Sequence, residues 1–447
     1  MKFTQGLGLI GGESIAFVGA GGKTTAMFTL SREIKSPVLL TTSTHLGVWQ
    51  AELADQHVII ASPDEIQKIP VFDQHKLLVT GPLGDDQRLA GLDMETLETI
   101  HRYCLAHGYT LLIEADGARQ RPIKAPAHYE PVIPAWVDQV VVMAGLSGLG
   151  KPLNANSVHR SEIFAQLSGR SVGETIQVED LAALLGSDVG GLKGIPDGAS
   201  LCLFLNQAEG AIRMAQGGRL AHELAEHYKR VLVGSLEQPG PDGPIFSTYS
   251  TTVGIILAAG GSARLGQPKQ LLDWWGEPFV RQVARNALAA GIKPLYVVLG
   301  AARALVENVL NDLPVSCVYN PDWEMGQSTS MKAGLAALPE YCERVMFLLS
   351  DQPHLPPDLM RQLIDRHDTQ RAPITMPLVR GSRGNPVLFS RETFDALMSV
   401  SGDQGGRSVF KQFEVDYVDW IDTRALLDVD NEDQLVVLRE AYFPDNQ

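Results

Sequence analysis

A short segment in the second half of the chain combines an apolar run, glycines and two basic residues in an order that suits phosphate binding. The run from Val253 to Leu257 predicts a buried strand that breaks into small residues and glycine. Glycines let backbone N–H groups approach a polyphosphate closely. Arg264 and Lys269, four and nine positions after Gly260, can neutralise its charge from two directions. The predicted nucleotide-binding residues at this loop are Leu257, Ala258, Ala259, Gly260 and Gly261.

Further polar elements fall at the ends of other predicted strands, where open α/β sheets place their ligands. They are the segments 320–330, 350–353, 383–386 and 428–433. Asp351 follows a strongly apolar run, and Asp430 lies in the last of these segments. Hard cations prefer oxygen ligands, so Asp351 and Asp430 are the predicted magnesium carboxylates. Asp428 and Asp433 are alternatives to Asp430 in the second position.

These residues suit nucleotidyl transfer. Attack of one phosphate on the α-phosphate of a nucleoside triphosphate is opposed by like-charge repulsion, which magnesium and basic side chains relieve. Arg264 and Lys269 would hold the β- and γ-phosphates, and with Asp351 they are the predicted catalytic residues. A phosphate nucleophile is already ionised near neutral pH. The reaction therefore needs no general base.

The same segments carry a family resemblance over about residues 253 to 440. The matching motifs are LAAGGSARLGQPKQLL, NPDWEMGQSTSMKAGL, LLSDQPHL, RGNPVLF, GDQGGR and LLDVDNEDQ. In them the chain resembles the molybdenum cofactor cytidylyltransferases, within the MobA-like nucleotidyltransferases. The resemblance implies transfer of CMP from CTP to molybdopterin cofactor with release of pyrophosphate, and it implies that Ser330 and the backbone of Ala258 to Gly260 face the cytosine base. Asn385 stands where many members have histidine, and Asn431 where threonine is common. Another nucleotide or a sugar-phosphate acceptor therefore stays open.

The first half contains a second glycine-rich segment between a predicted strand and a predicted helix. Gly22, Lys23 and Thr24 match the end of a P-loop, where N–H groups and lysine bind phosphates and threonine binds magnesium. The first glycine of that pattern would fall at Phe17. We predict that ATP or GTP binds at this loop, with a plain tight turn as the alternative. Asp116, which follows another strand, could hold magnesium through water.

The first half also resembles a family, the selenium-dependent hydroxylase accessory proteins, over about residues 14 to 235. The matching segments are VGAGGKTT, LLIEADGARQRPIKAPAHYEP and residues 148–160. The resemblance implies a role in maturing molybdenum hydroxylases, whose apo forms would be partners of the chain. The alternative function for the whole chain is that of a P-loop chaperone that uses a nucleoside triphosphate to deliver molybdenum cofactor.

The order of apolar runs predicts the fold class and the domains. With 447 residues, two or three domains are expected. We expect a P-loop-like accessory domain over 1–240 and a Rossmann-like nucleotidyltransferase domain over 252–447, each an α/β unit with a mostly parallel sheet covered by helices. The proline- and glycine-rich segment 238–244 is the expected linker. Strands are predicted at 15–18, 38–40, 58–60, 77–79, 111–113, 140–143, 201–205, 231–233, 253–257, 295–299, 315–319, 345–349, 374–376 and 387–389.

Bulk composition limits the class of partner. The net charge of −15, from 37 basic and 52 acidic residues, argues against a nucleic-acid-binding face. No apolar run approaches the roughly 20 residues that span a bilayer. We therefore expect a cytoplasmic protein without a membrane partner. The 4 cysteines form no C-x-x-C pair, which argues against a zinc site or disulfides, and Cys202 and Cys317 are expected to be buried thiols.

Overall fold

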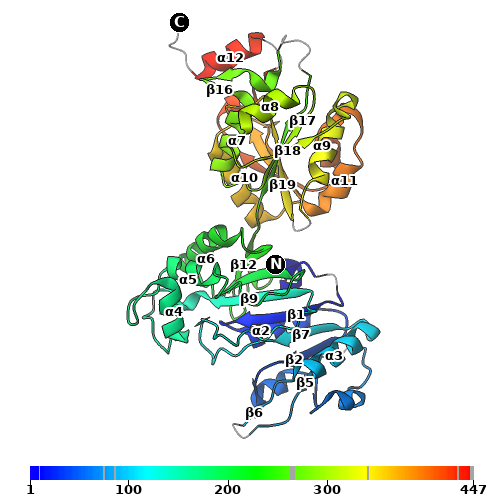
Figure 1. Cartoon of the computed structure of the whole chain (residues 1–447), viewed down its shortest axis with the longest axis vertical. Coiled ribbons are helices and arrows are strands. Elements are labelled where there is room, and N and C mark those ends of the chain that lie inside the picture. Colours follow the sequence, from blue (N-terminus) through cyan, green and yellow to red (C-terminus); the bar gives the residue numbers. More distant parts are fainter. Residues whose placement is uncertain are drawn as a thin grey trace. The chain divides into compact units, whose positions relative to one another are not determined.

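The computed structural model describes residues 1–9, 11–73, 76–84, 87–261, 267–339, 342–429 and 432–442. The chain forms two compact units, Met1–Ser250 (unit 1) and Thr251–Gln447 (unit 2), as Figure 1 shows. Arg264 and Asp430, two of the predicted site residues, lie outside the described residues. Within the described ranges, no helix has the length and apolar character needed to cross a membrane.

Unit 1 is built on a nine-stranded sheet in the order β13-β12-β11-β9-β1-β7-β2-β5-β4. Its neighbouring strands run parallel except for the antiparallel pair β12 and β13. The strands are β1 (Ser14–Gly19), β2 (Val38–Thr42), β4 (Gln56–Ile59), β5 (Lys76–Thr80), β7 (Thr110–Glu114), β9 (Gln139–Gly145), β11 (Ser200–Asn206), β12 (Arg230–Gly234) and β13 (Ile245–Tyr249). Two further pairs lie outside this sheet, β3 (Leu46–Gly47) with β6 (Arg88–Leu89) and β8 (Ile123–Lys124) with β10 (Val158–His159).

Helices cover both faces of the unit 1 sheet. Side chains alternate along β1, so that Ile15 and Phe17 enter one core cluster while Ala16 and Val18 enter the other. The first cluster contains residues of α1 (Phe3–Leu7) and α2 (Lys23–Glu33). The second contains residues of α3 (Met94–His107), α4 (Ser161–Ser168), α5 (Val178–Leu185) and α6 (Gly210–Leu224). A central strand buried on both faces explains why its sequence is continuously apolar.

Unit 2 contains an eight-stranded sheet in the order β18-β17-β14-β19-β22-β20-β21, with β23 also paired to β20. The strands are β14 (Val253–Ala258), β17 (Leu295–Leu299), β18 (Ser316–Tyr319), β19 (Arg344–Leu349), β20 (Ile374–Val379), β21 (Ser382–Arg383), β22 (Val387–Ser390) and β23 (Val415–Asp419), and β15 (Asp273–Trp274) pairs separately with β16 (Glu277–Pro278). The β18–β17, β17–β14, β14–β19 and β20–β23 pairs are parallel, whereas β22 and β21 join antiparallel. Both units are thus α/β with parallel-rich sheets.

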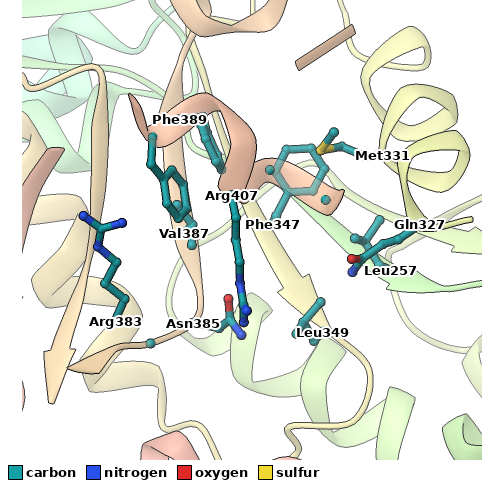
Figure 2. A pocket seen from close by; sticks show the side chains of 14 residues that line it. Leu257, Gln327, Met331, Phe347, Leu349, Arg383, Asn385, Val387, Phe389 and Arg407 are labelled. Atoms are coloured by element: carbon teal, nitrogen blue, oxygen red, sulfur yellow. The ribbon is translucent and has the colours of Figure 1, made fainter. Parts of the chain in front are cut away.

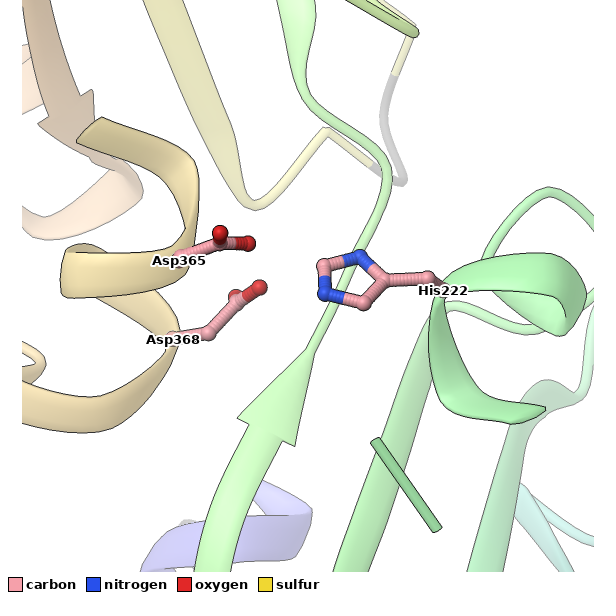
Figure 3. Close-up of side chains that lie close together, drawn as sticks. All are labelled: His222, Asp365 and Asp368. Atoms are coloured by element: carbon pink, nitrogen blue, oxygen red, sulfur yellow. The ribbon is translucent and has the colours of Figure 1, made fainter. Parts of the chain in front are cut away.

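The helices of unit 2 also cover both sheet faces. Ile256 packs with α7 (Phe279–Ala289), α8 (Arg303–Leu310) and α10 (Pro357–Gln370), and Ile255 packs with α9 (Gln327–Ala336) and α11 (Phe394–Met398). The last helix is α12 (Glu432–Tyr442). Asp365 and Asp368 project from the same side of α10 (Figure 3), and Asp368 forms a buried ion pair with Arg344 of β19. This pair joins the helix to the sheet.

Two details differ from the sequence-based expectations. Cys317 is exposed, because β18 is the edge strand and has β17 as a neighbour on one side only; the expectation of a buried thiol there was wrong. The sequence analysis also did not predict β13 or β23.

Candidate active site

The glycine-containing loop of unit 2 begins at the carboxyl end of β14. This strand lies between β17 and β19, so the residues Leu257 to Gly261 stand at the centre of the sheet edge. A Cβ atom at Gly261 would lie 2.8 Å from the Trp323 ring, so only glycine lets this ring pack against the loop. A Cβ at Gly260 would meet no atom of the described chain within 4 Å. Among the described residues, none therefore covers the loop at Gly260.

A buried glutamine holds the returning chain to this strand end. The Gln270 side-chain amide donates to the carbonyl oxygens of Ala258, at 2.9 Å, and Gly260, at 2.7 Å. Gln270 lies in the short turn Lys269–Leu271, directly after Lys269. It therefore fixes the position of the lysine relative to the loop. Sequence reasoning missed Gln270, because the segment gave no sign that this polar side chain would be buried.

Lys269 and Asp351 form the central contact of the site. The Lys269 Nζ atom donates to Asp351 Oδ2 at 2.5 Å, although the two residues are 82 positions apart in the chain. Their side chains are only 15% and 20% exposed. Burial raises the pKa of Asp351 from its ordinary value, while the Lys269 charge and hydrogen bond oppose that shift. The pair is therefore a partly buried, charged contact at the carboxyl edge of the sheet.

The second carboxylate oxygen of Asp351 suits a divalent cation. Asp351 Oδ1 is buried and has no hydrogen-bond partner among the described residues. A buried oxygen in this condition costs free energy unless a donor or a cation satisfies it. Magnesium takes oxygen ligands of this kind. The donor set at Asp351 therefore fits a magnesium ion.

A further acidic residue lies near Asp351. The negative charge of Asp428 contributes to raising the pKa of Asp351. The carbonyl of the preceding residue, Leu427, accepts a hydrogen bond of 3.5 Å from Gln352 Nε2. The segment before Asp430 thus reaches the SDQP turn. Because Asp430 is not described, Asp428 is the acidic residue of this segment whose proximity the structure supports.

A cavity of about 700 Å3 opens beside these strand ends. Leu257 and Leu349, which are paired across β14 and β19, line it, and Leu349 stands two positions before Asp351 in the chain. Its other walls are the apolar side chains of Met331, Phe347, Val387, Phe389 and Phe410 and the polar residues Gln327, Arg383, Asn385 and Arg407 (Figure 2). The cavity thus brings together the opening loop and the RGNP and GDQGGR motifs, which are far apart in sequence.

The two arginines that line the cavity differ in the contacts of their side chains. Arg383 Nε donates to the Tyr417 hydroxyl at 3.1 Å, and its guanidinium lies 5.6 Å from the centre of the Phe410 ring. Arg407 is exposed, and the structure gives it no such partner within the described residues. Arg383 is therefore held in place, whereas Arg407 can turn toward an anionic ligand.

Ser330, predicted to face a base, is buried on α9. Its hydroxyl accepts a hydrogen bond of 3.0 Å from Asn320 Nδ2, and Asn320 also donates to Thr329 at 2.8 Å. The neighbouring residue Met331 lines the cavity, but Ser330 does not belong to its lining. The role of Ser330 in base recognition stays a prediction.

The glycine-rich loop of unit 1 joins β1 to α2. Gly19, Gly21 and Gly22 have φ angles of 88°, 82° and 113°, which side chains other than glycine adopt only with strain. Lys23 is buried, and its Nζ atom donates to the Gly19 carbonyl at 2.6 Å and lies 3.0 Å from Asp116 Oδ1. Thr24 donates to Glu114 at 2.7 Å. The loop, the lysine, Glu114 at the end of the neighbouring strand β7 and Asp116 just after it thus lie together.

Comparison with known proteins divides the chain in the same way. Sequence models of two families match it, the YqeC protein over residues 15–162 and the MobA-like NTP transferase domain over residues 254–417. The chain is 29% identical over 239 residues to the uncharacterized protein YqeC of Escherichia coli (strain K12), covering 50% of this chain and 88% of that protein. It is 33% identical to the nicotine blue oxidoreductase of Paenarthrobacter nicotinovorans, covering 41% of this chain and 93% of that protein. It is 28% identical to the molybdenum cofactor cytidylyltransferase of E. coli, covering 42% and 95%.

Proposed function

The chain belongs to the MobA-like NTP transferase family through unit 2 and carries a YqeC domain in unit 1, and from this premise we propose that it is a molybdenum cofactor cytidylyltransferase. In this proposal unit 2 transfers CMP from CTP to molybdopterin cofactor and releases pyrophosphate. The observation that carries it is the contact between Lys269 and Asp351 at the edge of the sheet. A basic and an acidic residue held together beside a glycine loop suit a metal-bound triphosphate.

The transfer itself forms one bond and breaks another. A terminal phosphate oxygen of the acceptor attacks the α-phosphorus of CTP, and the bond from that phosphorus to the pyrophosphate oxygen breaks. Magnesium, when bound at Asp351 and a second acid, supplies electrostatic stabilisation of the phosphates. Lys269 turns from Asp351 to the non-bridging oxygens of the triphosphate and, with Arg264, neutralises the charge of the leaving pyrophosphate. The acceptor phosphate is already ionised, so no side chain has to remove a proton.

The cavity beside the strand ends supports a large acceptor. Its apolar rings suit a flat heterocycle, and Arg407 suits a terminal phosphate. Asn385, another lining residue, offers amide donors and an acceptor for a polar ring edge. We propose that this cavity takes the pterin part of the acceptor. A sugar phosphate would leave its apolar walls largely uncovered.

For unit 1 we propose that Gly22, Lys23 and Thr24 bind the phosphates of ATP or GTP. The three glycine φ angles and the helix that begins at Lys23 support this assignment. We also propose that apo molybdenum hydroxylases are partners of the chain and that the chain is cytoplasmic. Both proposals depend on the cytidylyltransferase proposal.

Pyrophosphate release by the full chain tests the proposal. With CTP, magnesium and molybdenum cofactor we expect release above background, and Asp351→Asn is expected to abolish it. Asp395→Asn, at an exposed position on α11, is the matched control and should remain active. One relative is named as an oxidoreductase, and electron transfer would not release pyrophosphate. A folded chain that releases none therefore contradicts the proposal, whereas a preference for GTP or ATP redirects it to a related nucleotidyltransferase.

The chaperone alternative predicts that activity in cells depends on unit 1 and not on the Asp351 carboxylate of unit 2. If delivery of cofactor by unit 1 is the function, Lys23→Ala alone would remove activity in cells and Asp351→Asn would have no effect. Under the transferase proposal Asp351→Asn removes activity in cells as well as in the purified protein. Molybdenum hydroxylase activity in a host that lacks its own copy of the chain distinguishes the two.

A further inference from the structure

Two buried acids at the end of β7 have different partners, and the difference separates their roles. Glu114 ends the strand and lies beside Phe17 of β1, and Asp116 follows it two residues later. Both side chains are buried, at 7% and 2% exposure. Glu114 accepts the Thr24 hydroxyl, and its other oxygen, Oε1, lies 3.9 Å from Lys23 Nζ. Asp116 is the closer partner of Lys23, with Oδ1 at 3.0 Å from the same nitrogen. Either acid has the position of a metal carboxylate beside a phosphate loop. The contacts of each carboxylate show which of the two fits a metal ion.

Glu114 and Thr24 already have the spacing of neighbouring metal ligands. The Thr24 Oγ1 atom lies 2.7 Å from Glu114 Oε2. Adjacent oxygens on an octahedral magnesium ion, each about 2.1 Å from the metal, are about 3 Å apart. A small opening of this hydrogen bond therefore admits the ion. The hydroxyl also lies in the first turn of α2, whose N–H groups have no intrahelical acceptor and no capping side chain.

Asp116 is instead surrounded by donors and cations. Its Oδ2 accepts the Gly19 N–H at 3.0 Å and lies 2.9 Å from Lys124 Nζ. Its Oδ1 is buried and has no hydrogen-bond partner among the described residues, as at Asp351, but it lies 3.0 Å from Lys23 Nζ. Two ammonium groups around one carboxylate leave no place for a further cation, because like charges at this distance repel strongly. Asp116 therefore does not fit a metal ion as it stands.

Lys124 supplies the charge that allows Lys23 to move. Its side chain is 1% exposed, and its Nζ atom makes no hydrogen bond within the described chain, only ion pairs with Asp116 and with Glu130 at 3.0 Å. It lines a small cavity together with Gly19 and Asp116. When Lys23 turns to a phosphate, Asp116 keeps Lys124 and is not left as an unpaired buried charge, which would be costly.

We propose that unit 1 binds its nucleoside triphosphate with a divalent cation held between Thr24 and Glu114, and that Asp116 is the resting partner of Lys23 rather than a metal ligand. The inference rests on the proposed nucleotide binding at Gly22, Lys23 and Thr24. Without phosphate, Lys23 is held by Asp116 and the Gly19 carbonyl. The incoming phosphates must compete with Asp116 for the lysine. The two acids, though two residues apart, then affect nucleotide affinity in opposite directions.

Nucleotide titration of the full chain tests this opposition. All variants carry Asp351→Asn, which removes the metal carboxylate of unit 2, and binding of N-methylanthraniloyl ATP or GTP is measured with and without magnesium. Only the part of the signal that Lys23→Met removes is assigned to unit 1. We expect Glu114→Gln and Thr24→Val to lose the magnesium-dependent gain in affinity, about tenfold, and Thr24→Ser to keep it. Asp116→Asn should keep that gain and bind the nucleotide several-fold more tightly.

Each outcome has a separate meaning. If no signal depends on Lys23, the proposed nucleotide binding of unit 1 fails, and this inference fails with it. If Lys23-dependent binding is present but Asp116→Asn loses the magnesium gain while Glu114→Gln keeps it, only the assignment of the two acids is overturned. Glu223→Gln, an exposed change on α6, is the matched control. Thermal melting of each variant verifies folding, and the Thr24→Val and Thr24→Ser pair still decides the question if Glu114→Gln fails to fold.

Discussion

At the scale of single residues, Lys269 has a partner in the structure of unit 2 and another partner in the proposed reaction. Lys269 contacts Asp351 in the structure, and the proposed reaction requires it to contact the triphosphate. The ion pair keeps the lysine in the site before the nucleotide arrives. The Lys269 charge also opposes the rise in the pKa of Asp351 that burial causes. The contact with Asp351 thus positions the same charge that the proposed reaction would use.

Removing the Lys269 charge should therefore slow the transfer. We expect Lys269→Ala to lower kcat for pyrophosphate release about a hundredfold, because the charge that develops on the leaving pyrophosphate loses a stabilising partner. Lys269→Arg should recover part of the rate, since it keeps the charge. Lys411→Ala, an exposed change in the same unit, should have no effect. A Lys269→Ala rate within twofold of the unmodified chain would show that this lysine does not act on the phosphates.

Gln270 makes a separate prediction, because it positions the loop without touching the reacting groups. Gln270→Ala leaves the carbonyls of Ala258 and Gly260 without their donor, which we expect to cost about 1–3 kcal/mol of stability. The loosened loop should raise KM for CTP more than it lowers kcat. Steady-state kinetics and thermal melting measure the two effects. An unchanged KM beside a lowered melting temperature would make Gln270 a purely structural residue.

At the scale of elements, a buried histidine joins α10 to two strands of unit 2. His367 Nδ1 lies 3.0 Å from the Thr375 hydroxyl on β20, and Nε2 lies 3.1 Å from the Ser390 hydroxyl on β22. Burial, with a smaller contribution from the charge of Arg344, lowers the pKa of His367 from 6.5 to about 3. The folded unit therefore keeps this imidazole neutral.

This histidine should make unit 2 sensitive to mild acid. Below pH 6.5 the unfolded chain takes up a proton at His367, whereas the folded chain does so only near pH 3. The free energy of unfolding should then fall by about 1.4 kcal/mol for each pH unit across this window. Urea unfolding between pH 7 and pH 4 measures the slope. His367→Asn should lower the stability at pH 7 and make the slope shallower; an unchanged slope would assign the acid sensitivity to other groups.

The sequence allowed most strands of both sheets to be predicted, including the edge strands β4 and β18, but not the edge strands β13 and β23. Buried parallel strands are continuous apolar runs, so β1, β11 and β14 could be recognised from composition. The strand β23, with the sequence VDYVD, carries charges because one of its sides is an edge. Cys317 lies in an apolar run, yet a run does not tell whether its strand has a neighbour on both sides. The missed strands β13 and β23 and the wrong burial of Cys317 on β18 therefore all belong to sheet edges.

The candidate sites show a similar division. Lys269 and Asp351 could be predicted from motifs at strand ends, because parallel strands bring their carboxyl ends to one edge. The separate partners of Glu114 and Asp116 could not, since both acids follow the same apolar run. Nor could the role of Gln270, which depends on two backbone carbonyls that only the folded loop brings into reach. Sequence patterns locate a site, whereas side-chain packing assigns the partners within it.

At the scale of the whole molecule, the chain is an assembly of two folding units. Each core cluster consists of residues from one unit only, and each unit has its own sheet. Units of this size with separate cores can unfold as separate steps. The family matches follow the same division, since the YqeC match lies in unit 1 and the MobA-like NTP transferase match lies in unit 2.

Calorimetry should therefore resolve two transitions. We expect CTP with magnesium to raise the temperature of one of them, because a ligand stabilises the folded unit that binds it. Asp351→Asn should remove that increase and leave the other transition in place. A single transition that shifts as a whole would show that the two units unfold together.

The exposure of Cys317 on the edge strand β18 has a practical consequence. The three other cysteines are buried, so a thiol-reactive dye should attach at this position in the folded protein. Partial burial raises the pKa of the Cys317 thiol, so coupling should speed up as the solution is made more alkaline. Mass spectrometry of the labelled chain and of Cys317→Ser checks the stoichiometry. The native thiol then provides a fluorescent reporter on unit 2, from which the distance to a second dye placed on unit 1 can be followed while nucleotides bind.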